Sequence, residues 1–202
     1  LNGWNTTFVW NMSSMFYGAT SFNQDINGWN TSNVTDMSRM FKGAKSFNRP
    51  LNGWDTAFVY NMSSMFYGAT RFHPPLNGWN TVSVTVMNHM FHGATRFNQD
   101  INGWNTAFVY NMSSMFYEAT SFNQNINGWN TSRVTNMSEM FYKAKSFDQP
   151  LEEWNISKVS KIEDIFHESG ITRDNYCKLF KGAYGKYWTK FILDLGKSYI
   201  CD

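Results

Sequence analysis

The chain has 202 residues, of which 42% are hydrophobic and 16% are charged, and its formal net charge is +2. So small a net charge, with lysine and arginine scattered along the chain, gives no electrostatic argument for nucleic-acid binding. No apolar run approaches the roughly 18 residues that a membrane-spanning helix needs, so we expect no membrane span.

Methionine and tryptophan mark a repeat of 25 residues. All 12 methionines occupy two positions of this repeat, and a column of tryptophans keeps the same period. The methionines are Met12, Met15, Met37, Met40, Met62, Met65, Met87, Met90, Met112, Met115, Met137 and Met140, and the tryptophans are Trp4, Trp29, Trp54, Trp79, Trp104, Trp129 and Trp154. A fixed period of this length is typical of a solenoid, in which each repeat forms one coil stacked on its neighbours.

The repeats define two regions of the chain. Six nearly complete copies start at Leu1, Ile26, Leu51, Leu76, Ile101 and Ile126, and a seventh, which drifts from the consensus, starts at Leu151. The sequence therefore predicts a seven-coil repeat solenoid over residues 1–166 and a C-terminal capping segment over residues 167–202.

Each coil is predicted to contain a short strand followed by a short helix. The segment around residues 31–35, with Val34 pointing inward, has the alternation of a strand. Met37, Met40, Phe41 and Ala44 then follow at i, i+3, i+4 and i+7, the spacing of one helix face.

A polar residue precedes each predicted helix and is interpreted as its N-cap. Asp36 holds this place in the second repeat, and Asn11, Asn61, Asn111 and Asn136 hold it elsewhere. Their side-chain oxygens can accept from the free N–H groups of a first helical turn. Val86 breaks the column, so we expect a frayed helix start in the fourth repeat.

A further asparagine column follows each tryptophan, at Asn5, Asn30, Asp55, Asn80, Asn105, Asn130 and Asn155. A calcium site needs several carboxylates converging on one loop, whereas these side chains are mostly neutral amides. We expect a structural ladder in which the amides bond to each other and to the backbone of adjacent coils.

Exposed aromatic residues supply the candidate binding face. Odd repeats carry an aromatic residue on each side of an inward valine, where even repeats carry polar residues. Because side chains alternate along a strand, the aromatics are predicted to point outward on alternate coils, about 10 Å apart. Such a patch favours a contact surface, although the rings could instead fold over neighbouring polar coils and shield the sheet. The residues are Phe8, Trp10, Phe58, Tyr60, Phe108 and Tyr110.

Catalytic and metal-binding chemistry find little support. The sequence shows no Ser/His/Asp, Cys/His or paired-carboxylate constellation and no phosphate-binding glycine loop, so we predict a non-enzymatic chain without a cofactor. His89 and His92 are three residues apart and could chelate a transition metal. The interpretation we adopt is a solvated face of the predicted helix, with no metal.

The closing segment contains both cysteines. Thr172 can cap a helix that turns Tyr176, Leu179 and Phe180 inward, and a second amphipathic stretch runs from Tyr187 to Leu195. Such a cap would cover the last coil. Cys177 and Cys201 could form a disulfide in an oxidising compartment or remain two unrelated thiols.

The motif from Trp29 to Asn48 reads W-N-T-S-N-V-T-D-M-S-R-M-F-K-G-A-K-S-F-N. It resembles the repeat of BspA-like surface proteins, also called the mycoplasma lipoprotein repeat. The resemblance covers residues 1–166, and residues 169–179 are similar to the segment that closes such arrays. It implies a leucine-rich-repeat-like solenoid at a cell surface or secreted, with a role in adhesion or host contact. Family members reach the surface through a signal peptide, a lipid anchor or a sorting tail, and we expect none of these within the 202 residues.

These features predict that a protein or glycan partner binds at the aromatic face. If the protein acts in adhesion, this partner would come from a host. The alternative is a spacer or self-assembling subunit whose aromatic face packs against other copies. The first coil, at Leu1, has no cap of its own, so two N-terminal edges could also pair about a two-fold axis as a homodimer. The competing explanation is that a preceding cap was cut away.

Overall fold

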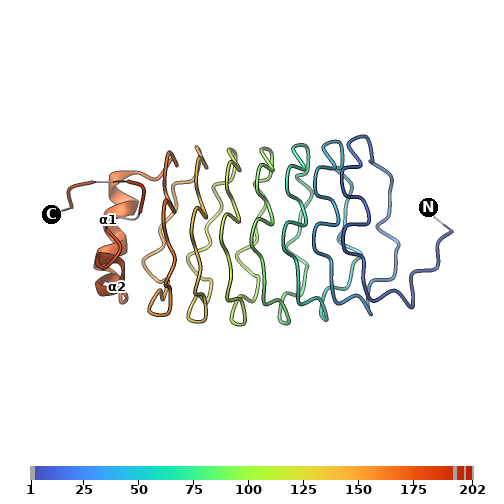
Figure 1. Ribbon diagram of the computed structural model, residues 1–202, viewed down its shortest axis with the longest axis horizontal. Coiled ribbons are helices and arrows are strands. Elements are labelled where there is room, and N and C mark those ends of the chain that lie inside the picture. Colours follow the sequence, from blue (N-terminus) through green and yellow to red (C-terminus); the bar gives the residue numbers. More distant parts are fainter. Residues whose placement is uncertain (1–2, 193–194, 198, 202) are drawn as a thin grey trace.

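The computed structural model describes residues 3–192, 195–197 and 199–201 and contains one row of stacked coils (Figure 1). We number the coils one to seven from their first residues, 1, 26, 51, 76, 101, 126 and 151, and number positions within each coil from that residue. Two helices, α1 (Arg173–Lys181) and α2 (Gly185–Thr189), lie at the C-terminal end of the row. The predicted solenoid is therefore present.

Adjacent coils are joined by a backbone ladder that runs in one direction. Isolated parallel bridges link residues 11, 36, 61, 86, 111, 136 and 161. From there, alternate N–H groups donate to the next coil: Met12 N to Asp36 O (2.9 Å), Ser14 N to Ser38 O (2.9 Å) and Phe16 N to Met40 O (2.9 Å). The same pattern recurs along the stack, so each coil is a template for the next.

The predicted helix within each coil is wrong, and the direction of these hydrogen bonds explains why. An α-helix needs every interior N–H group to donate within its own segment, but here every second N–H group donates to the neighbouring coil. Residues in the left-handed conformation interrupt the helical backbone, with φ of 56° at Arg39 and 75° at Gly43. The helical spacing still identified the inward side chains, because Met37, Met40, Phe41 and Ala44 are all fully buried.

The predicted N-caps are turns instead. The Asp36 carboxylate accepts from Ser38 N at 2.7 Å, and the asparagines of this column make the same bond two residues ahead. Val86 cannot make it, yet coil four keeps its place in the ladder, since Met62 N donates to Val86 O (3.1 Å) and Met87 N to Asn111 O (3.1 Å). The expected fraying at Val86 is therefore wrong as well.

The asparagine column at position 5 is structural, but its partners differ from those expected. Each Oδ1 accepts from an N–H two residues later in its own coil, as Asn30 does from Ser32 N at 3.0 Å. The link to the next coil comes from position 6, where the Thr31 hydroxyl donates to Asp55 O at 2.8 Å. Amides therefore shape the turns while threonines connect the coils.

Stacked rings form the core. Phe41 and Phe66 lie with centroids 5.6 Å apart, and Trp54 and Trp79 with centroids 6.5 Å apart. The indoles of coils three to seven also donate from Nε1 to a carbonyl of the previous coil, as Trp79 does to Leu51 O at 3.1 Å. Because burying one such side chain contributes about 1.5–3 kcal/mol, the eight inward positions per coil hold the stack together.

The cap covers the last coil. The predicted N-cap Thr172 is confirmed, since its side chain accepts from Asn175 N at the start of α1. Tyr176 and Leu179 are fully buried, as is Trp188 in α2. The coil ladder continues into the cap where Phe166 N donates to Leu195 O at 2.9 Å, so the cap supplies the acceptor that an eighth coil would offer.

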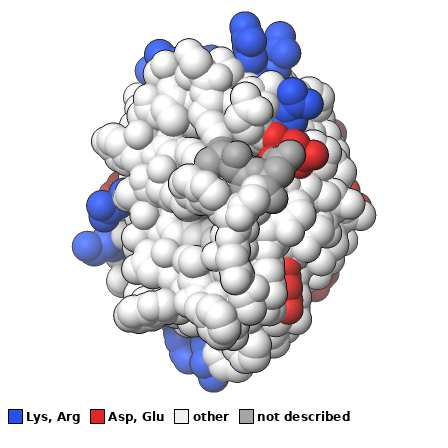
Figure 2. Space-filling view, turned by 90° about the vertical axis from the view of Figure 1, so that its right-hand side faces the viewer, with Lys and Arg blue, Asp and Glu red and all other residues white. Residues whose placement is uncertain are grey.

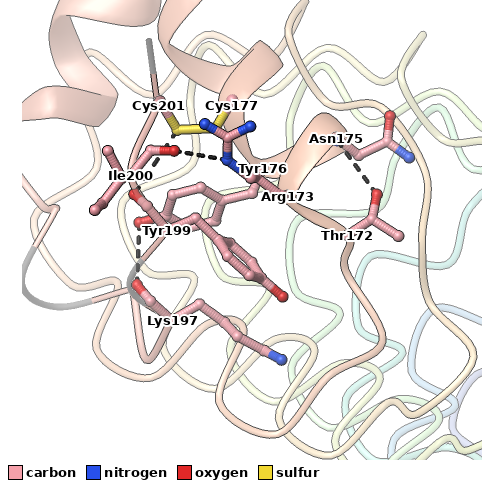
Figure 3. Close-up of a disulfide and its surroundings, with 9 residues drawn as sticks. All are labelled: Thr172, Arg173, Asn175, Tyr176, Cys177, Lys197, Tyr199, Ile200 and Cys201. Carbon is pink, nitrogen blue, oxygen red and sulfur yellow. Dashed lines mark hydrogen bonds between the residues drawn. A yellow bond between two sulfur atoms is a disulfide. The ribbon is translucent and has the colours of Figure 1, made fainter.

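A disulfide joins Cys177 to Cys201, with Cα atoms 5.4 Å apart (Figure 3). Side chains on α1 hold the same tail, since Arg173 Nε donates to Ile200 O (2.8 Å) and the Tyr176 hydroxyl to Lys197 O (3.0 Å). The C-terminal tail is thus fixed to α1 at three points.

Candidate binding face

The aromatic residues at positions 8 and 10 flank an inward valine. Val59 and Val109 are fully buried, and Val9 packs against the core at the N-terminal end. The backbone at position 10 forms a second ladder between coils, in which Tyr60 N donates to Thr35 O (2.9 Å) and Thr85 N to Tyr60 O (2.9 Å). The predicted alternation of inward valine and outward aromatics is confirmed.

All six aromatic side chains are exposed, and we call this set the aromatic strip. Within the described residues none of the six rings stacks on another aromatic ring. Their exposed fractions are 85% for Phe8, 70% for Trp10, 64% for Phe58, 48% for Tyr60, 45% for Phe108 and 49% for Tyr110. Whether they bind a partner stays a prediction.

Several polar side chains between the rings lie against the backbone, because they form hydrogen bonds with backbone carbonyls of the preceding coil. The hydroxyls of Thr35 and Thr85 donate to Trp10 O (3.0 Å) and Tyr60 O (3.2 Å). Asn33 Nδ2 donates to Thr7 O at 2.8 Å. At coil six the Arg133 guanidinium lies 4.7 Å from the Phe108 centroid, the one cation–π contact to a ring of this set within the described residues. The alternative that the rings fold over and shield the polar coils therefore has little support in their contacts.

A second aromatic column lies at position 17 and was missed by the sequence analysis. His92 lies between two tyrosines, with centroids 4.2 Å from Tyr67 and 4.3 Å from Tyr117. The column continues through Tyr142, 4.6 Å from Tyr117, to His167, 4.7 Å further. The signal was an aromatic or histidine at this position in six of seven coils, which we had assigned to the outer face of a helix.

His89 and His92 are therefore not on a solvated helix face. Both rings are half-buried, and both Nδ1 atoms are buried without a hydrogen-bond partner. Burial, then the neighbouring His89 and Lys42, lowers the pKa of His92 to about 4. Burial and Lys42 also lower the pKa of His89, against the opposing effect of Glu139. Within the described residues no group of three or more His, Cys, Asp or Glu could hold a metal ion.

The described residues of coil one, at the N-terminal end of the stack, are more exposed than their equivalents in the other coils. Trp4 is 55% exposed, whereas the equivalent tryptophans of the other coils are at most 5% exposed. A hollow of about 440 Å³ lies beside it, lined in part by Val9, Met12 and Met15. In the view onto this end, Lys and Arg lie at the rim and most of the face carries no charge (Figure 2).

The direction of the ladder limits what this end can pair with. In later coils positions 11, 13, 15 and 17 present carbonyls toward the N-terminal side. The same carbonyls of coil one have no backbone donor within the described residues. Two such edges cannot pair these segments with each other, because acceptor would face acceptor. A homodimer of two N-terminal ends would have to rest on apolar contact around Trp4 and Met15.

The family model described as "Mycoplasma protein of unknown function, DUF285" matches residues 1–91 and 72–178 of this chain. The chain belongs to the DUF285 family. Its fold is similar to that of a leucine-rich-repeat protein from T. pallidum, with a TM-score of 0.56 and 15% identity over 85% of this chain and 75% of that one. A comparison with curated protein sequences found no match.

These findings place a DUF285 chain in a leucine-rich-repeat-like fold without naming a ligand. The coils differ from the predicted strand-plus-helix units, since they consist of turns and single bridges. Within the described residues no helix has both the length and the apolar character needed to cross a bilayer.

Proposed function

We propose that this DUF285 chain is a non-catalytic surface or secreted protein of the BspA-like type, which binds a protein or glycan through the aromatic strip. The observation that carries the proposal is the exposure of six aromatic side chains, 45–85%, on alternate coils. Contiguous exposed apolar surface on a soluble chain marks interaction sites, and aromatic anchors contribute most of the energy there.

The strip suits a partner with an extended, repeating surface. The ladder at position 10 orders the backbone that carries the rings, so binding costs the rotamer entropy of the exposed side chains but little backbone entropy. Tyrosine and tryptophan each combine an apolar ring face with a polar tip. Two coils separate successive ring pairs, which is about 10 Å at the spacing of stacked strands.

The test is the triple substitution Trp10→Ala, Tyr60→Ala and Tyr110→Ala. We expect saturable binding on a glycan array or on a panel of extracellular-matrix proteins to fall about 100-fold or more, since hot-spot aromatics contribute roughly 2 kcal/mol or more each. The matched control is Ser21→Ala, Arg71→Ala and Ser121→Ala, at an exposed position of the same three coils, which should bind like the wild type.

The same variant separates the proposal from its alternative. If the aromatic strip packs against other copies of this chain, the triple substitution should change the sedimentation coefficient and leave the affinity for protein or glycan ligands unchanged. Unchanged binding and unchanged sedimentation together would rule out both roles for the strip.

A further inference from the structure

The position-17 column belongs to a surface that the aromatic strip does not include. We call it the Tyr–His face and define it by positions 14, 17 and 18 of each coil. Positions 14 and 17 are neighbours in space, since the His89 centroid lies 5.7 Å from His92 and 6.3 Å from Tyr67. The face consists of Ser14, Arg39, Ser64, His89, Ser114, Glu139 and Asp164 at position 14, of Tyr17, Lys42, Tyr67, His92, Tyr117, Tyr142 and His167 at position 17, and of Gly18, Gly43, Gly68, Gly93, Glu118, Lys143 and Glu168 at position 18.

The charges on this face change sign about coil four. Arg39 lies two coils before His89, and Glu139 lies two coils after it, with serines in the coils between. At position 17 the cation Lys42 lies two coils before His92, and the ring of Tyr142 two coils after it. Lys42 already contacts rings on its own face, with Nζ 4.3 Å from the Tyr67 centroid.

The shape of the face is complementary about the same coil. Position 18 is glycine in coils one to four, whereas Glu118, Lys143 and Glu168 project from coils five to seven. The glycines leave a hollow of about 330 Å³, lined by Tyr17, Gly18, Thr20, Lys42, Gly43, Lys45, Tyr67 and Gly68. One half of the face is therefore concave where the other half carries long side chains.

We propose that the Tyr–His face docks a second copy of this chain, antiparallel to the first, about a two-fold axis that runs along coil four. This axis places coil one opposite coil seven of the second copy, coil two opposite coil six, coil three opposite coil five, and coil four opposite itself. Arg39 then faces Glu139 of the second copy as an opposite-charge pair, and Lys42 faces its Tyr142, whose hydroxyl group can accept a hydrogen bond from the ammonium. The glycine hollow receives the side chains of Glu118, Lys143 and Glu168.

Other arrangements of two copies are less favourable. A parallel arrangement would bring Arg39 close to Lys42 of the second copy, and such like-charge contacts select against a wrong geometry. In the antiparallel arrangement two like-charge contacts remain, because Lys45 faces Lys145 and Lys143 enters the hollow beside Lys42. Both are moderated within each copy, since Glu168 accepts from Lys145 Nζ at 3.0 Å and Lys143 Nζ lies 3.9 Å from Glu118 Oε1.

The face is large enough for a specific contact. Seven coils at the spacing of stacked strands give a length of roughly 35 Å, and the five residues of positions 14–18 span at most about 16 Å. The product is about 560 Å² per copy, or about 1,100 Å² for both copies, which exceeds the roughly 1,000 Å² expected of a specific interface. The stacked rings also bind at a low entropic cost, because they are already ordered in each copy.

The test exchanges the two charges on the Tyr–His face. Arg39→Glu alone places two carboxylates opposite each other at both ends of the interface, and Glu139→Arg alone places two guanidinium groups there. Each single substitution should weaken dimerisation by about tenfold or more in analytical ultracentrifugation, because each creates two repulsive contacts. The double variant R39E/E139R restores opposite charges and should dimerise like the wild type.

Two controls fix the interpretation. Arg71→Glu reverses a charge at an exposed position outside the face and should leave dimerisation unchanged, and circular dichroism should show that every variant keeps its fold. Rescue by the double variant is the supporting outcome. A wild type that stays monomeric at every concentration, a double variant no better than the single ones, or an equal effect of Arg71→Glu would each overturn the proposal. The triple substitution in the aromatic strip tests the proposed function separately, since it touches no residue of this face.

Discussion

His92 connects burial to the stability of this protein at acid pH. Its ring lies between Tyr67 and Tyr117, and burial lowers its pKa from 6.5 to about 4. A histidine whose pKa is lowered by folding contributes stability that is fully present above pH 6.5 and is lost as the pH falls toward 4. The full linkage would be about 3 kcal/mol, which solvent screening of a half-exposed ring reduces to about 1–2 kcal/mol.

Replacing this histidine by the tyrosine that its neighbours carry should remove the effect. We expect the unfolding free energy of His92→Tyr, measured by urea denaturation at pH 7 and pH 4, to fall about 1–2 kcal/mol less than that of the wild type. His73→Gln, a change of an exposed histidine outside the column, serves as control and should retain the wild-type pH dependence. An equal fall in His92→Tyr and wild type would contradict the account.

At the scale of the coil, left-handed residues decide between a helix and a turn. Gly68 has φ of +66°, and a Cβ added there would meet nothing closer than 3.9 Å, so only its backbone conformation resists substitution. Gly68→Ala should therefore lower the unfolding free energy by about 1 kcal/mol. The equivalent residue Glu118 adopts φ of 52°, so Glu118→Gly should raise the unfolding free energy by a similar amount. The control is Gly78→Ala, because the added Cβ has open space there and φ is not left-handed. Thermal or chemical denaturation should show no change in its unfolding free energy. An equal loss of unfolding free energy in Gly78→Ala and Gly68→Ala would refute the role of the left-handed conformation.

The same residues show what the sequence could and could not predict. Hydrophobic spacing identified every inward apolar column but not the buried threonines of position 6, and the alternation around Val59 identified the exposed rings of the aromatic strip. The backbone between them was not predictable in the same way, because the i, i+3, i+4, i+7 spacing suits both a helix and this turn. Ser64 and His89 also adopt positive φ, and neither residue type signals that conformation as glycine does. The Tyr–His face was not recognised because positions 14, 17 and 18, at i, i+3 and i+4, were assigned to a solvated helix face, whereas the structure stacks the position-17 rings from coil to coil.

At the scale of the whole molecule, a stack in which each coil contacts only its neighbours should respond locally to a change at one end. The Cys177–Cys201 disulfide closes a segment with a sequence separation of 24, for which loop entropy predicts a stabilisation of about 3 kcal/mol. Replacing both cysteines by serine should therefore loosen α1, α2 and the last coil while coils two to four keep their stability. Hydrogen exchange measures this directly: amides near Phe166, whose N–H donates to Leu195 O, should exchange faster in the variant, and Met62 N–H in coil three should exchange at the wild-type rate. The reduced wild type is the matched control and should behave like the variant. A uniform increase in exchange along the stack would mean that the coils unfold as one cooperative unit, contrary to nearest-neighbour coupling.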